Sequence, residues 1–132
     1  GATHIIARVL ESLRDSQPFT LNGADYPTED GTCVRDYVHV EDIARAHLLA
    51  LGSGVPCGVY NLGAGAGTSN AQIMDLAQRT TEKALNIQIG PKREGDPAIL
   101  TASSAKFDAL AKDWRHYSLD DIINHAWKWY NR

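Results

Sequence analysis

The stretch that most narrows the possible folds is residues 60–70, YNLGAGAGTSN, where a short apolar segment runs into three glycines and then into a helix signal. Ser69 and Gln72 have the spacing of a capping box, in which each side chain bonds the other residue's backbone at a helix start. A strand, a glycine-rich turn and a helix in succession predict an α/β domain. Such a turn also resembles a site that cradles a phosphate at a helix N-terminus.

The glycine spacing argues against a nucleotide at this turn. The dinucleotide fingerprint is G-x-G-x-x-G, followed about 20 residues later by an acidic residue that binds the ribose. Here the glycines stand at 63, 65 and 67, and Glu82, near the expected distance, falls at the end of a predicted helix. We therefore interpret the glycines as positions that permit a tight turn with positive φ angles.

Periodicity in the rest of the chain predicts a small mixed domain of about three short strands and five helices. Helical spacing of apolar residues covers 3–13, 41–51, a segment opened by Ser69, a short segment after Ser104 and the final segment after Ser118. Strand patterns cover 33–40, 58–62 and 87–89, with a shorter one at 19–21. Three short strands offer little cover for five apolar stripes, so we expect part of this apolar surface to need a partner.

Composition excludes several classes of protein. The chain has 132 residues, enough for one domain, and its net charge of −3 argues against non-specific binding to nucleic acid. No apolar run is long enough to span a membrane. Cys33 and Cys57 form no C-x-x-C pair and lie near no histidine cluster, which predicts reduced thiols in a cytoplasmic protein without a metal site.

Two arginines stand in settings that suit an anionic ligand. In the predicted strand 33–40, alternation puts Arg35 and Tyr37 on one face, and a charge in mid-strand is unusual. Arg93 lies in the turn KREGDP, three residues before Asp96. A guanidinium is planar, always charged and able to bind two phosphate oxygens at once. The alternative for both arginines is a solvated or ion-paired surface position.

Two histidines are further candidates for a site. His47 lies on the apolar stripe predicted for helix 41–51, made of Val40, Ile43, Ala44, His47, Leu48 and Leu51, which predicts a core histidine. His39 shares a strand face with Arg35 and Tyr37, which leaves a site role open.

The run DYPTEDGTCVRDYVHVEDIARAH at residues 25–47 closely resembles UDP-glucose 4-epimerases of the extended short-chain dehydrogenase/reductase superfamily. VYNLGAGAGTSN, REGDPA, Trp114 and the tryptophan-containing terminal helix resemble the same family, in the same order, so the resemblance covers nearly the whole chain. Related nucleotide-sugar dehydratases and decarboxylases differ in the first of these runs.

The resemblance implies a set of UDP-sugar contacts and no catalytic residue in this chain. Arg35 and Arg93 would hold the pyrophosphate, Asp96 the ribose hydroxyls, and Tyr37 would line the site. The chain departs from the family at Asn22, where many members have a phenylalanine that packs on uracil, and at Leu100, where many have a tyrosine near the sugar. His4 resembles a site residue of an HLIP-type segment.

The family's chemistry also implies parts that this sequence lacks. Its members bind NAD on an N-terminal Rossmann domain with a G-x-x-G-x-x-G turn and use a Tyr-x-x-x-Lys pair, and neither motif occurs here. We therefore expect residues 1–132 to be the C-terminal UDP-sugar-binding domain of a homodimeric parent isomerase of galactose metabolism, without the NAD-binding domain. This chain alone should bind no NAD and should not turn over substrate.

Two other interpretations remain open at this stage: a stand-alone, non-catalytic nucleotide-sugar binding module, and the C-terminal part of a related nucleotide-sugar dehydratase. The sequence begins with Gly1, and its only methionine is Met74, which favours a piece of a longer or processed protein over a module. The run DGTCVRDYVHV favours an epimerase over a dehydratase.

Overall fold

Helices and short strands are mixed along the part of the chain that a computed structural model describes, residues 3–52 and 54–132. The described helices are α1 (Ile5–Asp15), α2 (Val40–Ala50), α3 (Asn70–Thr81), α4 (Ala105–Asp108) and α5 (Leu119–Tyr130). The described strands are β1 (Phe19–Asn22), β2 (Val34–Arg35), β3 (Thr68–Ser69), β4 (Ile87–Gly90) and β5 (Ile99–Leu100). The predicted α/β class and its five helices are confirmed, with five described strands in place of about three.

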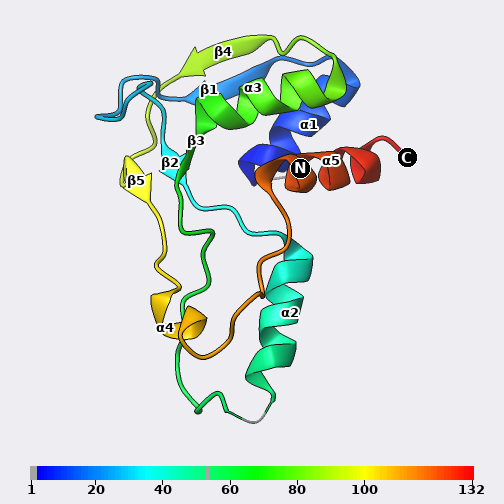
Figure 1. The fold of residues 1–132 in the computed structure, drawn as a ribbon. Helices are drawn as coiled ribbons and strands as arrows, with labels where there is room; N and C mark the ends of the chain where they lie inside the picture. The colour runs from blue at the N-terminus through cyan, green and yellow to red at the C-terminus, as the bar shows by residue number, and fades with distance from the viewer. Residues whose placement is uncertain (1–2, 53) are drawn as a thin grey trace.

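The strands form two small sheets. β1 pairs with β4 in parallel, from Phe19 opposite Ile87 to Asn22 opposite Gly90. β2 lies between β3, its antiparallel neighbour, and β5, its parallel neighbour, so that Arg35 stands opposite Leu100. Figure 1 shows the first sheet at one end of the molecule with α1, α3 and α5, whereas α2 and α4 lie at the other end. The second sheet lies between the two ends.

The larger core lies at the end that carries β1 and β4. α1 buries Ile6, Val9, Leu10 and Leu13, the stripe predicted from their helical spacing. They pack with side chains of β1, α3 and α5, among them Phe19, Leu21, Ile73, Met74, Leu76, Ala77 and Ile123. Fully burying one such aliphatic side chain stabilises the fold by about 1.5–3 kcal/mol. The burial of these side chains therefore holds α1, α3 and α5 against β1.

A second, smaller core lies at the opposite end. Ala46 of α2 packs with Phe107, Ala111 and Trp114, and the ring of Trp114 is almost fully buried. The indole Nε1 of Trp114 donates a hydrogen bond to Asp108 Oδ1 at 2.8 Å, so its one polar atom is satisfied. The sequence predicted Trp114 on the same short helix as Phe107, but α4 ends at Asp108 and Trp114 packs from the segment that follows.

The N-terminus of α2 joins the two ends of the molecule. His39 is buried at its N-cap, where Nδ1 accepts a hydrogen bond from Glu41 N, and Nε2 lies 3.0 Å from His125 Nδ1 of α5. The His39 ring also stacks on Tyr117, with ring centroids 4.0 Å apart. Asp42, almost fully buried, accepts from the backbone N–H groups that precede α5. His39 therefore has a structural role at this junction.

The predicted orientation of α2 is wrong. Val40, Leu48 and Leu51 of the predicted apolar stripe are 75%, 71% and 86% exposed, and His47 is exposed as well. The helix instead buries Asp42 and Ala46, because these residues face the loop before α5 and the Trp114 cluster. An apolar stripe shows which face a helix tends to bury, but only neighbouring elements decide whether it is covered.

The strand predictions also need correction. Residues 58–62 form no strand; the strand near the glycines is β3, at Thr68–Ser69. The predicted strand 33–40 is reduced to Val34–Arg35, because only these residues have paired neighbours on both sides. A strand needs a hydrogen-bonding partner, and an alternating pattern in one segment does not specify that partner.

The helix starts at Ser69 and Ser118 are confirmed. Ser69 accepts from Gln72 N while the Gln72 side chain accepts from Ser69 N, and Ser118 forms the same reciprocal pair with Asp121. Ser104 precedes α4 but makes no side-chain capping bond, because its hydroxyl binds Gly63 instead.

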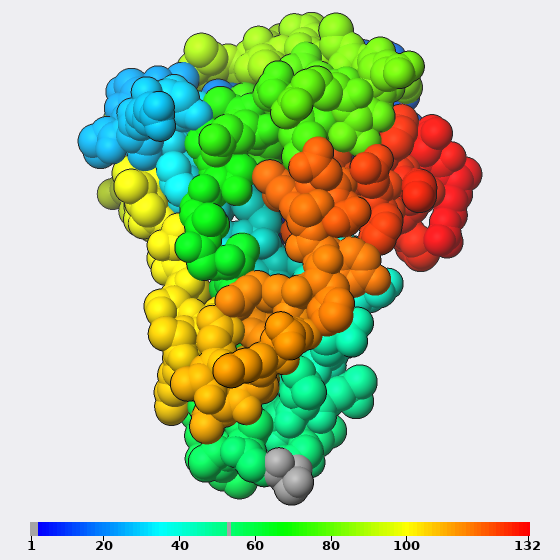
Figure 2. Space-filling model, viewed as in Figure 1, coloured from blue at the N-terminus to red at the C-terminus, as the bar shows by residue number. Residues whose placement is uncertain are grey.

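The space-filling view shows a molecule that is broad around α3 and β4 and narrows toward the end formed by α2 and α4 (Figure 2). Among the described helices, none is long and apolar enough to cross a membrane.

Candidate functional site

One cleft of about 520 Å³ brings together all the residues that the sequence singled out for substrate contact. Its wall includes His4, Asn22, Arg35, Tyr37, Arg93, Asp96 and Leu100. These residues come from the start of α1, the end of β1, the segment through β2, the 93–96 turn and β5. The structure therefore gathers into one cleft residues that are separated by most of the chain length.

Arg35 is held at the cleft wall by two contacts. Its Nη2 lies 2.5 Å from Asp96 Oδ1, and its Nη1 donates to the carbonyl oxygen of Val34 at 2.7 Å. The Arg35 and Asp96 side chains are 21% and 33% exposed, so the pair is only partly open to water. Cys33 Sγ also lies 3.9 Å from Asp96 Oδ2, within reach of a weak S–H donor. Arg35 is thus ion-paired, as one alternative supposed, but the pair lines a cleft.

A tight turn places Arg93 and Asp96 together. The backbone N–H of Asp96 donates to the carbonyl of Arg93 at 3.3 Å, and Gly95 has a φ of 77°. This combination is typical of a type II turn, in which the third residue needs a positive φ and is therefore usually glycine. The turn lets one loop supply both a guanidinium and the carboxylate that pairs with Arg35.

Arg93 is oriented by Asn22 at the end of β1. In the amide orientation that satisfies both groups, Asn22 Oδ1 accepts from Arg93 Nε at 2.9 Å and from Nη2 at 3.1 Å. Asn22 stands opposite Gly90 in the sheet, and Gly90 lies three residues before Arg93 in the sequence. The strand pairing therefore brings the side chains of Asn22 and Arg93 within reach of each other. Among the described residues, no carboxylate lies within ion-pair distance of Arg93.

Tyr37 contributes its ring to the cleft. Its side chain is buried, its ring lies edge-on to His4 with centroids 5.8 Å apart, and its hydroxyl has no hydrogen-bond partner among the described residues. Burial raises the pKa of the Tyr37 hydroxyl to about 12, because ionisation would place a charge in a poorly solvated position. The phenol is therefore neutral at ordinary pH.

The remaining wall is formed by β5 and the residues that follow it. Leu100 is 58% exposed in the cleft, beside Arg35 in the sheet. Asp36 fixes this wall, since its Oδ2 accepts from Ala102 N at 3.1 Å and its Oδ1 accepts from Ala64 N at 2.7 Å. One carboxylate thereby holds the glycine-rich loop and the end of β5 in place.

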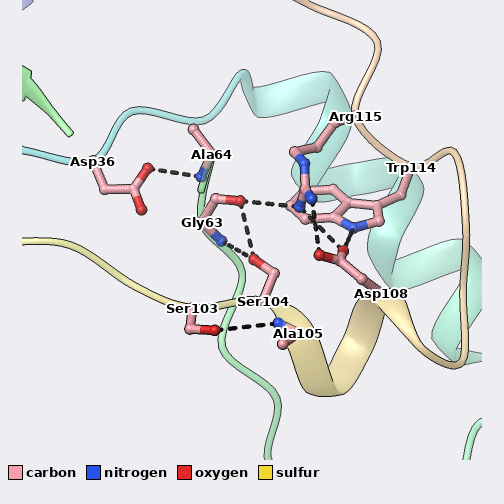
Figure 3. A network of polar contacts seen from close by, with 9 residues as sticks. All are labelled: Asp36, Gly63, Ala64, Ser103, Ser104, Ala105, Asp108, Trp114 and Arg115. Atoms are coloured by element: carbon pink, nitrogen blue, oxygen red, sulfur yellow. Dashed lines mark hydrogen bonds and ion pairs between the residues drawn. The ribbon is translucent and has the colours of Figure 1, made fainter. Parts of the chain in front are cut away.

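The glycine-rich loop is a packing junction. Gly63 N donates to Ser104 Oγ at 2.6 Å, while the carbonyl of Gly63 accepts from Ser104 Oγ and from Arg115 Nη1 (Figure 3). A Cβ atom at position 63 would lie 2.4 Å from Asp36 Oδ2, so a larger residue would force this junction apart. Of the glycines at 63, 65 and 67, only Gly65 has a positive φ, at 81°. The expected turn geometry therefore holds for one glycine, and close packing explains Gly63.

Sequence reasoning missed two charged residues of the cleft. Arg8 of α1 lines it, with Nη2 donating to the carbonyl of Thr20 and its guanidinium 5.0 Å from the Phe19 ring centroid. Asp36 also lines the cleft, and sequence reasoning gave it no role at a site. A charge within an amphipathic helix is typical of a solvated surface, so no local signal separates Arg8 from other surface arginines.

The net charge of the cleft is opposite in sign to the net charge of the whole chain. Three arginines and two aspartates line the cleft, which leaves it net positive, although the chain carries a net charge of −3. Because an anion gains most where guanidinium groups converge, this arrangement suits a phosphate-bearing ligand.

The sequence and fold of this chain are similar to those of one class of known proteins. Residues 1–63 match the NAD dependent epimerase/dehydratase family. Within that class the similarity is to UDP-glucose 4-epimerases: the enzyme from Lactobacillus helveticus is 42% identical over 134 residues, which cover 97% of this chain and 40% of that protein. The resemblance seen in the sequence is thereby confirmed, and this chain is similar along nearly its whole length to the C-terminal part of those enzymes.

Solved structures agree with the sequence matches. The UDP-glucose 4-epimerase from Brucella ovis in complex with NAD has a TM-score of 0.88 at 36% identity, covering 98% of this chain and 41% of that one. The UDP-glucose 4-epimerase from Stenotrophomonas maltophila, with bound NAD and formylated UDP-arabinopyranose, has a TM-score of 0.88 at 32% identity, covering 98% and 40%. This chain thus spans about 40% of the length of the relatives it matches.

Proposed function

We propose that this chain is the UDP-sugar-binding part of an NAD-dependent UDP-glucose 4-epimerase. The parent enzyme would interconvert UDP-glucose and UDP-galactose through a 4-keto intermediate. In this proposal Arg35 and Arg93 bind the pyrophosphate, and Asp96 contributes both to the ribose site and to the position of Arg35.

The observation that carries the proposal is the net positive cleft in which Arg35, Arg93 and Asp96 meet. A pyrophosphate offers several oxygens, and two guanidinium groups from separate loops are suited to bind them from two sides. The related enzyme from Stenotrophomonas maltophila is described with a UDP-sugar, which supports the same ligand class for this cleft.

We do not expect NAD at the glycine-rich turn of this chain. The glycine-rich turn before α3 is the part that most resembles a dinucleotide site, but Asp36 and Ser104 bind the backbone N–H groups of Ala64 and Gly63. The N-terminus of α3 is capped by its own Ser69 and Gln72. NAD binding and hydride transfer are therefore assigned to a separate Rossmann domain of the proposed parent, and the residues of this chain bind and orient the nucleotide sugar.

The test is a titration of the purified chain with UDP. Binding is measured by calorimetry and by the NMR chemical-shift changes of the arginine side chains. We expect binding in the millimolar range or better, with shifts at Arg35 and Arg93, and no response to NAD. Absence of UDP binding at saturating concentrations would contradict a nucleotide-sugar site in this chain. Incubation with UDP-galactose and NAD should give no product above a protein-free control, and turnover would contradict the assignment of catalysis to another domain.

A further inference from the structure

The contact between Asn22 and Arg93 leaves one edge of the guanidinium free. Arginine has five N–H donors, one on Nε and two on each Nη. Asn22 Oδ1 takes the Nε donor and one Nη2 donor at 2.9 and 3.1 Å. The unused donors are both on Nη1 and one on Nη2. One Nη1 donor and the remaining Nη2 donor are parallel and form the edge that can bind two oxygens of a phosphate.

Two of the three cleft arginines, Arg35 and Arg93, differ in the charge around them. Arg35 is matched by Asp96 at 2.5 Å. Arg93 is oriented by a neutral amide and, within residues 3–52 and 54–132, has no carboxylate at ion-pair distance. Asn22 therefore fixes the orientation of Arg93 without cancelling its charge, which an aspartate at the same position would do.

We propose that Asn22 is a positioning residue that presents the Nη1–Nη2 edge of Arg93 to a phosphate group of the bound nucleotide. This role rests on the proposed function, because it needs a phosphate in the cleft. It differs from a contact with the base, since Asn22 acts through Arg93. The free guanidinium is held before the ligand arrives, and less side-chain freedom is lost on binding.

This role predicts that changes at Asn22 alter the affinity for ligands that carry phosphate and leave the affinity for ligands without phosphate unchanged. Asn22→Ala removes the orienting oxygen, so UDP affinity should fall several-fold while the affinity for uridine stays unchanged. Asn22→Asp keeps an oxygen opposite Nε and Nη2 but adds a negative charge, so UDP affinity should fall further, by about tenfold or more, because the carboxylate neutralises Arg93 and repels phosphate. A residue that contacts the base would change UDP and uridine affinity together.

The experiment combines binding with a direct view of the contact in the free chain. The Arg93 Nε–H signal in NMR spectra should exchange slowly with water in the wild type and in Asn22→Asp, and rapidly in Asn22→Ala. UDP and uridine affinities are measured for the same proteins. Asn86→Ala is the matched control, because Asn86 is an exposed asparagine just before β4, outside the cleft.

Each outcome decides the proposal. Loss of Arg93 protection together with a loss of affinity confined to UDP supports it. UDP affinity that is unchanged in Asn22→Ala, or an equal loss for uridine, overturns the role of Asn22 and leaves the proposed function standing. A wild-type chain that binds no UDP overturns the proposed function and this role with it.

Discussion

Arg35 and Asp96, 61 residues apart in the sequence, form an ion pair in the wall of the cleft, with Arg35 Nη2 and Asp96 Oδ1 2.5 Å apart. The pair joins β2 to the turn that carries Arg93, and so fixes the spacing between the two guanidinium groups. Because Asp96 already offsets the charge of Arg35, an incoming phosphate would share Arg35 with this carboxylate, whereas Arg93 is free of such competition. The two arginines should therefore contribute unequally to binding.

Replacing Arg35 or Arg93 should weaken UDP binding. Removing one partner of a buried charged pair in a complete interface costs about 2–5 kcal/mol, and an open cleft screened by water should show less. We expect Arg93→Ala to lose more affinity than Arg35→Ala. Calorimetric titration with UDP measures both, with the exposed Arg79→Ala of α3 as control. Unchanged affinity in both cleft variants would remove these arginines from the site.

Tyr37→Phe should stabilise the fold without altering UDP affinity. The Tyr37 hydroxyl is buried and has no hydrogen-bond partner in the described part of the chain, and such an unsatisfied group costs about 1–3 kcal/mol. Its removal should raise the unfolding midpoint in urea. Because burial raises the pKa of Tyr37 to about 12, no pH dependence of UDP binding below this value should come from its ionisation. A loss of stability or affinity in Tyr37→Phe would show that the hydroxyl has a partner in solution.

The exposed apolar side chains on and just after α2, Val40, Leu48 and Leu51, should cause the chain to self-associate. These side chains are 75%, 71% and 86% exposed, and contiguous exposed apolar surface favours association. We expect sedimentation coefficients that rise with concentration, and a smaller rise for a Leu48→Glu, Leu51→Glu double variant. Ile89→Glu, on the exposed face of β4, is the control. A wild-type chain that stays monomeric and binds no hydrophobic dye would contradict this expectation.

Leu100 should influence which sugar a full-length epimerase carrying this segment accepts. Leu100 lines the cleft beside Arg35 and lacks the ring and hydroxyl of tyrosine, so it leaves more room near the sugar. A small apolar difference in a pocket shifts discrimination by about 1–3 kcal/mol. We expect activity on UDP-N-acetylglucosamine as well as UDP-glucose, and a selective loss of the former in Leu100→Tyr. The measurement is the ratio of kcat/KM for UDP-N-acetylglucosamine to kcat/KM for UDP-glucose. If this ratio is the same in the wild type and in Leu100→Tyr, Leu100 does not control the choice of sugar.

Asp30 should make the fold sensitive to acid. Partial desolvation alone would raise the pKa of Asp30, although the residue as a whole is exposed, but hydrogen bonds from Ser69 and Thr32 outweigh this effect and lower the pKa below its usual 3.8. A lowered pKa in the folded state stabilises the protein above the unfolded value of 3.8, and this contribution is lost as the pH falls through the folded pKa.

The Asp30→Asn variant tests this contribution through urea unfolding at a series of pH values. Its free energy of unfolding should be lower than that of the wild type at neutral pH, and the difference should shrink as the pH falls below 3.8. Glu29→Gln, at the exposed neighbouring position, should leave the pH profile unchanged. A difference between Asp30→Asn and wild type that stays constant with pH would exclude ionised Asp30 as its source.

Local patterns in the sequence determined much of the fold. The stripe of Ile6, Val9, Leu10 and Leu13 predicted α1, the pair Ser69–Gln72 predicted where α3 begins, and Ser118 predicted where α5 begins. These signals are readable because the interacting residues lie within two helical turns of one another. The motif around Arg35 and the REGDPA turn also predicted most of the cleft, through resemblance to a family.

Only the tertiary structure decided which apolar faces are covered and how the charges of the cleft are paired. The Leu48 side of α2 stays exposed, and residues 58–62 find no strand partner, because both outcomes depend on neighbours far along the chain. The Arg35–Asp96 pair and the contact between Asn22 and Arg93 likewise join separate segments. Such contacts are set by strand register and turn geometry, and no single segment of the sequence encodes them.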